Sequence, residues 1–316
     1  MDEAQNVILD EAQNVILNEA QNVILNEAQN VIMDEAQNVI LNAAQNVILN
    51  EVKDLKEGTM MRAKEVCKII SQDKIAKDIF SCWIEAKNIA NEAMAGQFVS
   101  LYCADKSRLL PRPISICEID KNKGAIRLVY RACGAGTDEF AKLLAGDTIE
   151  VLGPLGNGFP LDEAKNKKVF LIGGGIGIPP MVEVAKQLDA DKIAVCGYRD
   201  ETYLVDDLSA NAKVIIATED GSAGVAGNVL DAIRDNKAEA DIIFACGPTP
   251  MLRAIKAYAL ANNIECYISM EERMACGIGA CLACVCQSKD QDHHSNVHNK
   301  RICKDGPVFL STEVEL

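Results

Sequence analysis

The chain has 316 residues, 49% of them hydrophobic and 25% charged, so it is long enough for two or three domains with substantial cores. Its net charge of −14 argues against nucleic acid or an anionic membrane as a partner. No apolar run approaches a membrane span, and no basic-then-apolar signal peptide opens the chain. Thirteen cysteines without an export signal indicate a reducing compartment, so we expect a cytoplasmic protein whose thiols stay free or bind metal.

The first part of the chain is a repeat. Residues 2–49 are six near-identical copies of the octapeptide (D/N)EAQNVIL, and residues 1–59 carry eleven acids and two lysines. Eight residues of straight helix turn by about 800°, so the apolar triplet rotates about 80° per copy and forms no fixed face. We expect a dispensable or untranslated extension, with translation starting at Met60 or Met61. The alternative is an oligomerising arm.

From about Met61 to Leu155, short apolar runs are separated by Gly, Asn and Lys, a pattern that predicts an antiparallel barrel. Two short motifs interrupt the pattern. Arg112-Pro113-Ile114-Ser115 places a cation and a hydroxyl on one strand. Gly134-Ala135-Gly136-Thr137 is a small loop whose amides could meet a phosphate, and a helix through Leu144 is predicted after it. Taken alone, each motif is equally compatible with a structural role. The predicted strands cover residues 97–102, 114–119, 125–130 and 147–152.

Residues 167–265 alternate between strands and helices, which predicts a doubly wound parallel sheet. A buried strand over 168–172 leads into a glycine loop, Gly173-Gly174-Gly175-Ile176-Gly177, and then into a helix over 181–188. Bare amides and the helix dipole at such a junction can hold a pyrophosphate. The later strands are predicted at 193–196, 214–217 and 241–245, and the later helices at 228–236 and 250–262.

A second motif, Cys246-Gly247-Pro248-Thr249-Pro250-Met251, falls at the carboxyl end of a predicted strand, where open sheets bind ligands. By itself Cys246 could equally be a small core residue. Arg199 follows another strand and could meet a 2′-phosphate, whereas Asp200 beside it favours a free ribose hydroxyl. The preference between NAD and NADP therefore stays open at this point.

The most specific stretch is MEERMACGIGACLACVC, which begins at Met270. Cys276, Cys281 and Cys284 form a C-x4-C-x2-C run, the spacing of plant-type two-iron, two-sulfur ferredoxins, and Cys303 supplies a distant fourth thiol. Glycine and alanine between the cysteines let the backbone fold closely around a cluster. We therefore expect a 2Fe-2S cluster at these four residues.

Two other interpretations of the cysteines were weighed. They could be reduced structural thiols, or part of a zinc site with the downstream histidines His293, His294 and His298. The gap of eight residues between Cys284 and His293 is shorter than zinc-finger spacing, and zinc would leave Cys276 and Cys303 unexplained. Cys286 is interpreted as a small buried side chain.

The order of barrel, R-x-x-S, glycine loop, C-G-P-x-P-M and cysteine cluster resembles the ferredoxin-reductase superfamily. More closely, it resembles the electron-transfer subunits of dihydroorotate dehydrogenase B, over about residues 61–316. The most specific segments are ERMACGIGACLAC and the closing CKDGPVF. One departure is visible, because the stretch from Cys284 to Cys303 is longer than usual for this family.

The resemblance implies FAD, a 2Fe-2S cluster held by the four cysteines, and NAD(H) as co-substrate. It implies domains at 60–157 for FAD, 158–265 for NAD and 266–316 for the cluster, after the 1–59 extension. The FAD-binding residues it implies are Arg112, Pro113, Ile114, Ser115, Val129, Tyr130, Arg131, Gly136 and Thr137. The nicotinamide-side residues it implies are Gly173, Gly174, Gly175, Gly177, Cys246, Gly247 and Pro248.

The function implied by the resemblance is electron transfer in pyrimidine biosynthesis. A separate FMN-containing catalytic subunit oxidises dihydroorotate, and electrons then pass through the cluster and FAD to NAD+, in a heterotetramer of two plus two subunits. No acid or base for dihydroorotate is assigned to this chain. One alternative is a related flavin and iron–sulfur subunit with a ferredoxin, sulfide or hydrogenase partner, although four cysteines with none replaced by aspartate favour the dihydroorotate system. The other is a zinc-stabilised interaction module.

Overall fold

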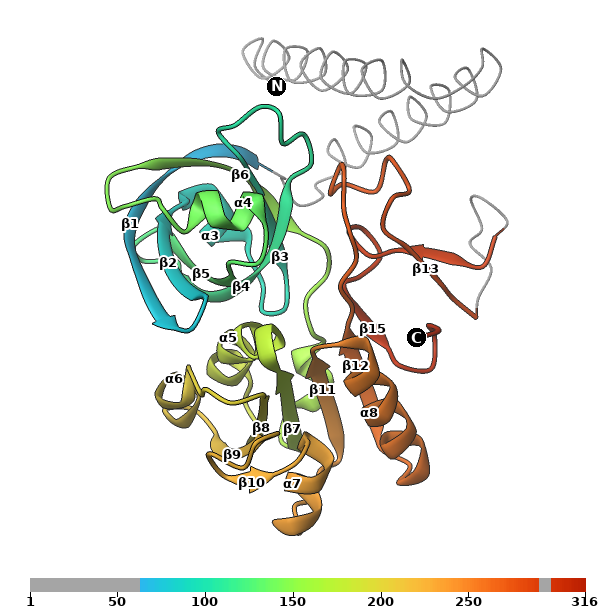
Figure 1. The fold of residues 1–316 in the computed structure, drawn as a ribbon. Coiled ribbons are helices and arrows are strands. Elements are labelled where there is room, and N and C mark those ends of the chain that lie inside the picture. Colours follow the sequence, from blue (N-terminus) through green and yellow to red (C-terminus); the bar gives the residue numbers. More distant parts are fainter. Residues whose placement is uncertain (1–62, 290–296) are drawn as a thin grey trace. The chain divides into compact units, whose positions relative to one another are not determined.

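The computed structural model describes residues 63–289 and 297–316 (Figure 1). The octapeptide repeat, both proposed start methionines, His293 and His294 lie outside the described residues, so those predictions are not addressed. Within the described part, no helix is long and apolar enough to cross a membrane.

The predicted barrel is present and closed, with strand order β1-β2-β5-β4-β3-β6 (Figure 1). Each strand of the barrel buries one of its two faces. The barrel core includes Ile84, Leu101, Ile126, Leu128 and Val151. The helix α4 is shorter than predicted. It ends at Phe140, and the Gln72 side chain donates to the carbonyls of Phe140 and Leu143 just beyond that end. The strands are β1 (Ala63–Ala76), β2 (Ile79–Glu85), β3 (Phe98–Tyr102), β4 (Arg112–Asp120), β5 (Ala125–Arg131) and β6 (Thr148–Leu155), with the helices α3 (Lys87–Glu92) and α4 (Ala135–Phe140).

The second half is a seven-stranded sheet of order β10-β9-β8-β7-β11-β12-β15. Its strands run parallel except β15, which comes from the C-terminal segment and pairs antiparallel with β12. The sequence pattern did not predict this seventh strand. The strands are β7 (Lys168–Gly174), β8 (Asp191–Tyr198), β9 (Lys213–Thr218), β10 (Val225–Ala226), β11 (Ile242–Cys246), β12 (Glu265–Ser269) and β15 (Val308–Leu310).

Helices cover both faces of this sheet, as a doubly wound fold requires. On β7, Val169 and Leu171 pack in one buried cluster with α5 and α6, whereas Phe170 and Ile172 pack in another with α7 and α8. The side chains of a strand point alternately to opposite faces, which explains the uninterrupted apolar run. The helices are α5 (Pro179–Gln187), α6 (Val205–Ser209), α7 (Val229–Asp235) and α8 (Thr249–Ala261), with short 3₁₀ helices η1 (Leu161–Ala164) and η2 (Gly175–Gly177).

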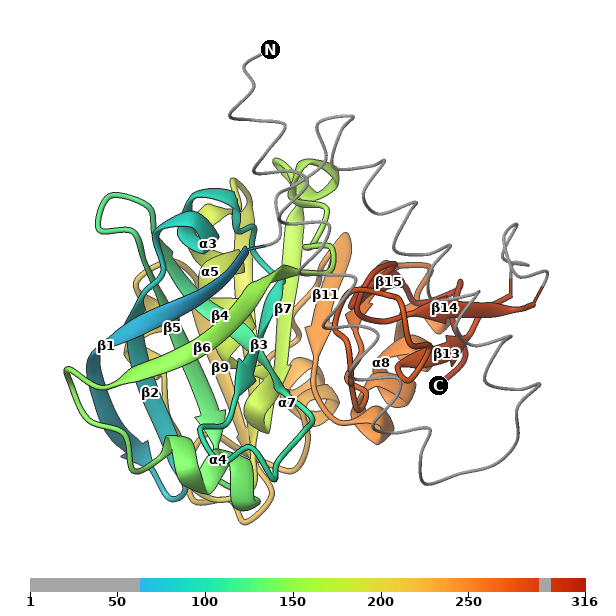
Figure 2. The same ribbon diagram turned by 90° about the horizontal axis from the view of Figure 1, so that it is seen from above.

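The remaining C-terminal residues form a small ribbon and two tight turns (Figure 2). Strand β13 (Val285–Gln287) pairs antiparallel with β14 (Asn299–Arg301). The two cysteine-bearing segments lie immediately before and after this ribbon, so the pairing of β13 with β14 brings them together.

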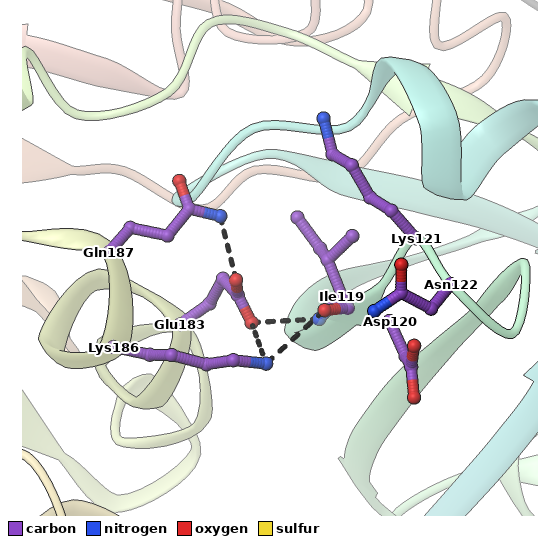
Figure 3. A pocket seen from close by; sticks show the side chains of 7 residues that line it. All are labelled: Ile119, Asp120, Lys121, Asn122, Glu183, Lys186 and Gln187. Carbon is purple, nitrogen blue, oxygen red and sulfur yellow. Dashed lines mark hydrogen bonds and ion pairs between the residues drawn. The ribbon is translucent and has the colours of Figure 1, made fainter.

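The barrel and the sheet meet at helix α5, which packs on strand β4. Glu183 of α5 is 2% exposed, and its Oε2 accepts a hydrogen bond of 2.7 Å from the Ile119 amide at the end of β4 (Figure 3). Gln187 Nε2 donates to its other oxygen at 2.6 Å. Seven residues line a cavity of about 420 Å³ beside this contact.

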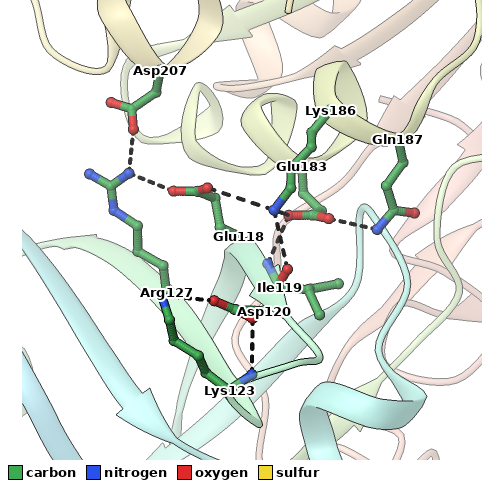
Figure 4. Close-up of polar contacts among 9 residues, drawn as sticks. All are labelled: Glu118, Ile119, Asp120, Lys123, Arg127, Glu183, Lys186, Gln187 and Asp207. Carbon is green, nitrogen blue, oxygen red and sulfur yellow. Dashed lines mark hydrogen bonds and ion pairs between the residues drawn. The ribbon is translucent and has the colours of Figure 1, made fainter. Parts of the chain in front are cut away.

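Ion pairs also join the barrel to the parallel-sheet half of the protein (Figure 4). Arg127 of β5 lies 2.7 Å from Glu118 of β4 and 2.5 Å from Asp207 of α6. Lys186 of α5 reaches the Ile119 carbonyl at 3.2 Å. These polar contacts fix the helix that follows the glycine loop against the strand that begins with Arg112.

Candidate functional site

The four predicted cluster cysteines come together as two pairs. The amide of Cys276 donates to the sulfur of Cys281 at 3.5 Å, and the amide of Cys281 donates to the sulfur of Cys276 at 3.4 Å. The amide of Cys303 donates to the sulfur of Cys284 at 3.4 Å. Cys276 also contacts the Cys303 thiol, which joins the pairs. The separation of 19 residues between Cys284 and Cys303 is closed by the β13–β14 ribbon.

The loop that carries the first three cysteines depends on left-handed backbone. Gly277 and Gly279 have φ of 71° and 88°, and a Cβ on Gly279 would lie 2.9 Å from the Lys304 side chain. Leu282 adopts φ of 59° between two of the cysteines and is exposed. The glycines therefore allow the close approach of the two cysteine segments that was expected from the sequence.

Arg301 and Asp305 hold the turn that presents Cys303. Asp305 lies in the closing CKDGPVF segment, although the sequence predicted no role for it, and Arg301 lies outside the motifs. The Asp305 carboxylate accepts from the Arg301 amide at 2.7 Å and from its guanidinium at 3.1 and 3.2 Å. The same guanidinium donates to the Gly279 carbonyl at 3.3 Å, on the other cysteine segment. Arg301 thus ties the fourth thiol to the loop of the first three.

The chemistry of this set suits an iron–sulfur cluster. Contacts with the Cys281 and Cys303 thiols lower the pKa of Cys276, and the contact with Cys303 lowers the pKa of Cys284. The same contacts raise the pKa of Cys281 and of Cys303, chiefly because each of these thiols donates a hydrogen bond to a neighbouring sulfur, with burial and repulsion between thiolates adding to the shift where no cation lies between them. Iron supplies that cation, and the two pairs match the two irons of a cluster with four cysteine ligands.

Of the three histidines in the zinc interpretation, His298 is the one that the described residues include. Within 63–289 and 297–316, no group of three or more His, Cys, Asp or Glu side chains has the arrangement of a single-ion site. His298 is exposed, and its Nδ1 lies 2.9 Å from the Lys289 carbonyl. Cys286, on β13, is half-buried rather than buried, and burial raises its pKa.

The cysteine loop packs directly on the barrel. A Cβ on Gly277 would lie 3.2 Å from both Leu155 Cδ1 and Ser100 Oγ. Strand β3, which carries Ser100, pairs with β4, so that Ser100 lies opposite Pro113. The cysteine loop therefore packs on β3, the strand that lies directly beside the predicted flavin strand β4.

On the predicted flavin side, the structure brings Arg112 and Gly136 together. A Cβ on Gly136 would overlap the Arg112 guanidinium, so a larger residue here would displace the end of the arginine side chain. Pro113, Ile114 and Ser115 are half-buried on the same strand. The Arg112 guanidinium and the loop that contains Gly136 thus lie side by side, although the two motifs are separate in the sequence.

Other predicted flavin residues have structural partners. The Tyr130 hydroxyl donates to Gln72 Oε1 at 2.8 Å inside the barrel, and the Val129 side chain is also buried. Thr137 Oγ1 accepts from the amides of Cys133 and Gly134 and so shapes its own loop. The Tyr130, Val129 and Thr137 side chains are therefore engaged in contacts within the protein.

The nicotinamide-side motifs meet at the carboxyl ends of β7 and β11. These adjacent parallel strands are the point where the strand order reverses, which is where open sheets bind nucleotides. Gly173 lies opposite Cys246 in the register, and a Cβ on Gly177 would overlap the Cys246 carbonyl. A Cβ on Gly247 would lie 3.2 Å from the Gly174 amide. Burial raises the pKa of Cys246 to about 12, so its thiol is neutral. Pro248 follows at the exposed end of the motif.

Arg131 connects the two ligand regions. It is the last residue of β5, and its Nη2 lies 3.9 Å from where a Cβ on Gly175 would be. It also faces Tyr203, whose pKa burial raises to about 12 while the guanidinium opposes that shift. Arg199 and Asp200 are both exposed after β8, where they were predicted.

The chain is similar in sequence to proteins of known family. Residues 271–315 match the family model for the iron–sulfur cluster binding domain of dihydroorotate dehydrogenase B. The chain is similar to the dihydroorotate dehydrogenase B (NAD(+)) electron transfer subunit of Geobacillus kaustophilus (strain HTA426), with 41% identity over 263 residues, covering 81% of this chain and 100% of that one. The subunit of the same name from Listeria monocytogenes serotype 4a (strain HCC23) is 42% identical over 255 residues, covering 79% of this chain and 98% of that one.

Solved structures agree with the fold. The structure of an NADH-dependent reduced ferredoxin-NADP oxidoreductase, described for flavin-based electron bifurcation, has a TM-score of 0.71 and 30% identity and covers 81% of this chain and 91% of that one. A ferredoxin NADP+ reductase from Neisseria gonorrhoeae with bound FAD and NADP has a TM-score of 0.53 and 17% identity, covering 63% of this chain and 91% of that one, a likeness of fold.

Proposed function

The chain belongs to the family of electron transfer subunits of dihydroorotate dehydrogenase B, and we propose from this premise that it passes electrons from dihydroorotate to NAD+. The observation that carries the proposal is the gathering of Cys276, Cys281, Cys284 and Cys303 on a loop that packs against barrel strand β3. A one-electron site would thereby lie next to the predicted flavin strand.

The geometry supports the following proposal for the residues that hold each cofactor. The four cysteines would hold a 2Fe-2S cluster, and the surface made by Arg112 and Gly136 would hold the FAD. The glycine loop and the Cys246–Pro248 segment would hold NAD(H) at the strand-order reversal. When bound, the cluster exchanges single electrons and the flavin exchanges single electrons or hydride, so that a two-electron oxidation is coupled to hydride transfer to NAD+.

The protein's own contribution is to position these groups and to keep water out. The Leu155 and Phe98 side chains are buried between the barrel and the cysteine segments, which leaves an apolar contact there. The Glu183 carboxylate and the Ile119 amide hold α5, and with it the glycine loop, against the flavin strand. The cationic Arg131 lies at the junction, where an anionic flavin or a pyrophosphate would be stabilised.

We also propose an FMN-containing catalytic subunit as partner, in a heterotetramer of two plus two. In that assembly the partner oxidises dihydroorotate to orotate, releasing two electrons and two protons. NAD+ takes up both electrons and one proton as hydride, and the second proton enters solution. The described residues of this chain supply no acid or base for dihydroorotate in this proposal.

The test is dihydroorotate-dependent formation of NADH by the full chain mixed with an FMN-type dihydroorotate dehydrogenase subunit. We expect activity only in the mixture, and loss of activity in Cys281→Ser. Cys286→Ser is the matched control, because this half-buried thiol lies two residues from Cys284 without joining the four. The proposal is refuted if the mixture is inactive although this chain contains its iron and FAD and the partner subunit contains its FMN.

A second candidate function is electron exchange with a ferredoxin, favoured by the likeness to the ferredoxin-NADP oxidoreductase. The same preparation distinguishes the two. Reduction of a ferredoxin by NADH with this chain alone, together with an inactive dihydroorotate mixture, would favour the second candidate.

A further inference from the structure

Ser100 is a buried hydroxyl without a partner. It lies on β3 with 0% of its surface exposed, and among the described residues its Oγ has no hydrogen-bond partner. Its strand neighbours Val99 and Leu101 point into the barrel core, so Ser100 points outward from the barrel with Phe98. A buried, unpaired hydroxyl destabilises a fold, and so its place in an apolar contact requires an explanation.

The hydroxyl faces the cysteine loop. A Cβ on Gly277 would lie 3.2 Å from Ser100 Oγ, and Gly277 directly follows Cys276. On the strand beside it, Ser100 is opposite Pro113 of the flavin motif. Ser100 therefore lies where the loop of the first cluster ligand covers the strand next to the flavin strand.

The sulfur of Cys276 already accepts from backbone amides. Ala280 donates to it at 3.3 Å and Cys281 at 3.4 Å. A serine hydroxyl rotates freely about its C–O bond, so its proton can turn towards an acceptor that a ligand brings. A cluster bound by these cysteines brings sulfur acceptors that carry negative charge.

We propose that Ser100 donates a hydrogen bond to a sulfur on the Cys276 side of the bound cluster and thereby raises the reduction potential of that cluster. The proposal rests on the proposed function, since it requires a cluster at the four cysteines. Reduction adds negative charge that spreads over the sulfurs, so a donor stabilises the reduced form more than the oxidised form. Ser100 is a positioning and tuning residue in this account.

The test is a redox titration of the full chain, purified without oxygen, that follows the cluster by its electron paramagnetic resonance and the flavin by its absorbance. In Ser100→Ala we expect the ratio of reduced to oxidised cluster at a fixed potential to fall by about three- to tenfold, and tenfold corresponds to 59 mV for one electron. Ser100→Thr keeps a hydroxyl and should restore most of the shift. Ser311→Ala is the matched control, because Ser311 is equally buried but bonds the remote Cys266 thiol.

A second measurement separates tuning from structure. In thermal unfolding of the iron-free chain, the melting temperature of Ser100→Ala should be no lower than that of the unaltered protein. The reason is that, among the described residues, the hydroxyl has no hydrogen-bond partner to lose. A marked loss of stability there would overturn the proposal. An unchanged cluster potential in Ser100→Ala, or a shift confined to the flavin, would also overturn it while the proposed function stands. A chain that binds no iron would overturn both.

Discussion

Glu183 provides the sharpest test of how the two halves are held together. Its carboxylate is buried and accepts from the Ile119 amide at 2.7 Å and from Gln187 at 2.6 Å. Replacing it with alanine removes a hydrogen bond to a charged acceptor, worth about 1.5–3 kcal/mol, and leaves a buried amide without that partner. The Lys186 ammonium lies 3.7 Å from the Glu183 carboxylate and is 44% exposed. In the alanine variant it regains hydration, and this gain offsets little of the lost stability. We expect Glu183→Ala to lower the free energy of unfolding by about 2 kcal/mol.

The same substitution should slow flavin reduction. Helix α5 begins directly after the glycine loop, and Ile119 lies near the end of the strand that begins with Arg112. Loss of the contact loosens the nicotinamide side against the flavin side, and small misplacements of reacting groups reduce rates strongly. We expect the rate of flavin reduction by NADH to fall severalfold while the FAD content is unchanged, measured by stopped-flow absorbance.

Equilibrium unfolding in urea measures the stability term. With a slope of about 3 kcal/mol/M, a loss of about 2 kcal/mol lowers the midpoint by about 0.7 M. Glu183→Gln keeps an acceptor oxygen and should lose about half as much. Glu150→Ala is the control, because the ion pairs that the structure describes for Glu150, with Lys64 and Lys106, are exposed, and its loss should stay within about 0.5 kcal/mol. The reasoning is refuted if Glu183→Ala unfolds at the same midpoint as Glu150→Ala.

Three further predictions concern separate parts of the molecule. Gly177→Ala should raise the KM for NAD(H) at least tenfold with FAD retained, since its Cβ would overlap the Cys246 carbonyl; unchanged steady-state kinetics would contradict this. Arg301→Gln should weaken iron retention severalfold during dialysis against a chelator, because the link to the Gly279 carbonyl is lost, and equal iron loss in both proteins would argue against that role. Burial raises the pKa of Cys82 to about 12, so its contribution to stability is complete below the unfolded-state pKa near 9 and declines from there to pH 12. Cys82→Ala should therefore reduce the alkaline slope of the unfolding free energy by up to about 1.4 kcal/mol per pH unit, followed by urea midpoints between pH 8 and 10.5.

The fold was largely predictable because its signals are local. The strand expected at 168–172 is β7, and the helix expected at 250–262 is α8 (Thr249–Ala261). The antiparallel barrel was likewise predicted from short apolar runs and turns, and the barrel and the doubly wound sheet are confirmed. Turn chemistry and apolar periodicity act within a few residues, which is the range that a sequence pattern reveals.

The features that were missed depend on contacts between distant residues. Strand β15 joins the sheet only because the C-terminal segment returns to pair with β12, and its three apolar residues are too short a run to predict a strand from the sequence. The carbonyls at the early end of α4 are satisfied by Gln72, more than sixty residues away. The Glu183 contact is a further case, since an acidic residue in an amphipathic helix is usually solvated and nothing nearby in the sequence marks it as buried.

The candidate site shows the same division. Cys276, Cys281 and Cys284 were predicted by spacing, because three ligands on one loop must follow that loop's geometry. Cys303 could be predicted only as a distant fourth. The contacts of Arg301 with Asp305 and with the Gly279 carbonyl could not be predicted, because they close the gap between two segments that are distant in the sequence. The assignments of the individual cofactor-binding residues remain predictions.

Strand β3 explains why the two redox sites can be read separately in the sequence yet lie together in the fold. Val99 and Leu101 point into the barrel core, while Phe98 and Ser100 point towards the cysteine loop. A run of five mostly apolar residues therefore serves two interfaces at once, and its alternation is hidden because both faces are buried. A serine in such a run looks like a tolerated polar residue until the loop that covers it is known. The task that we propose for the hydroxyl exists only in the folded protein, where the cysteine loop packs on β3 beside the predicted flavin strand β4.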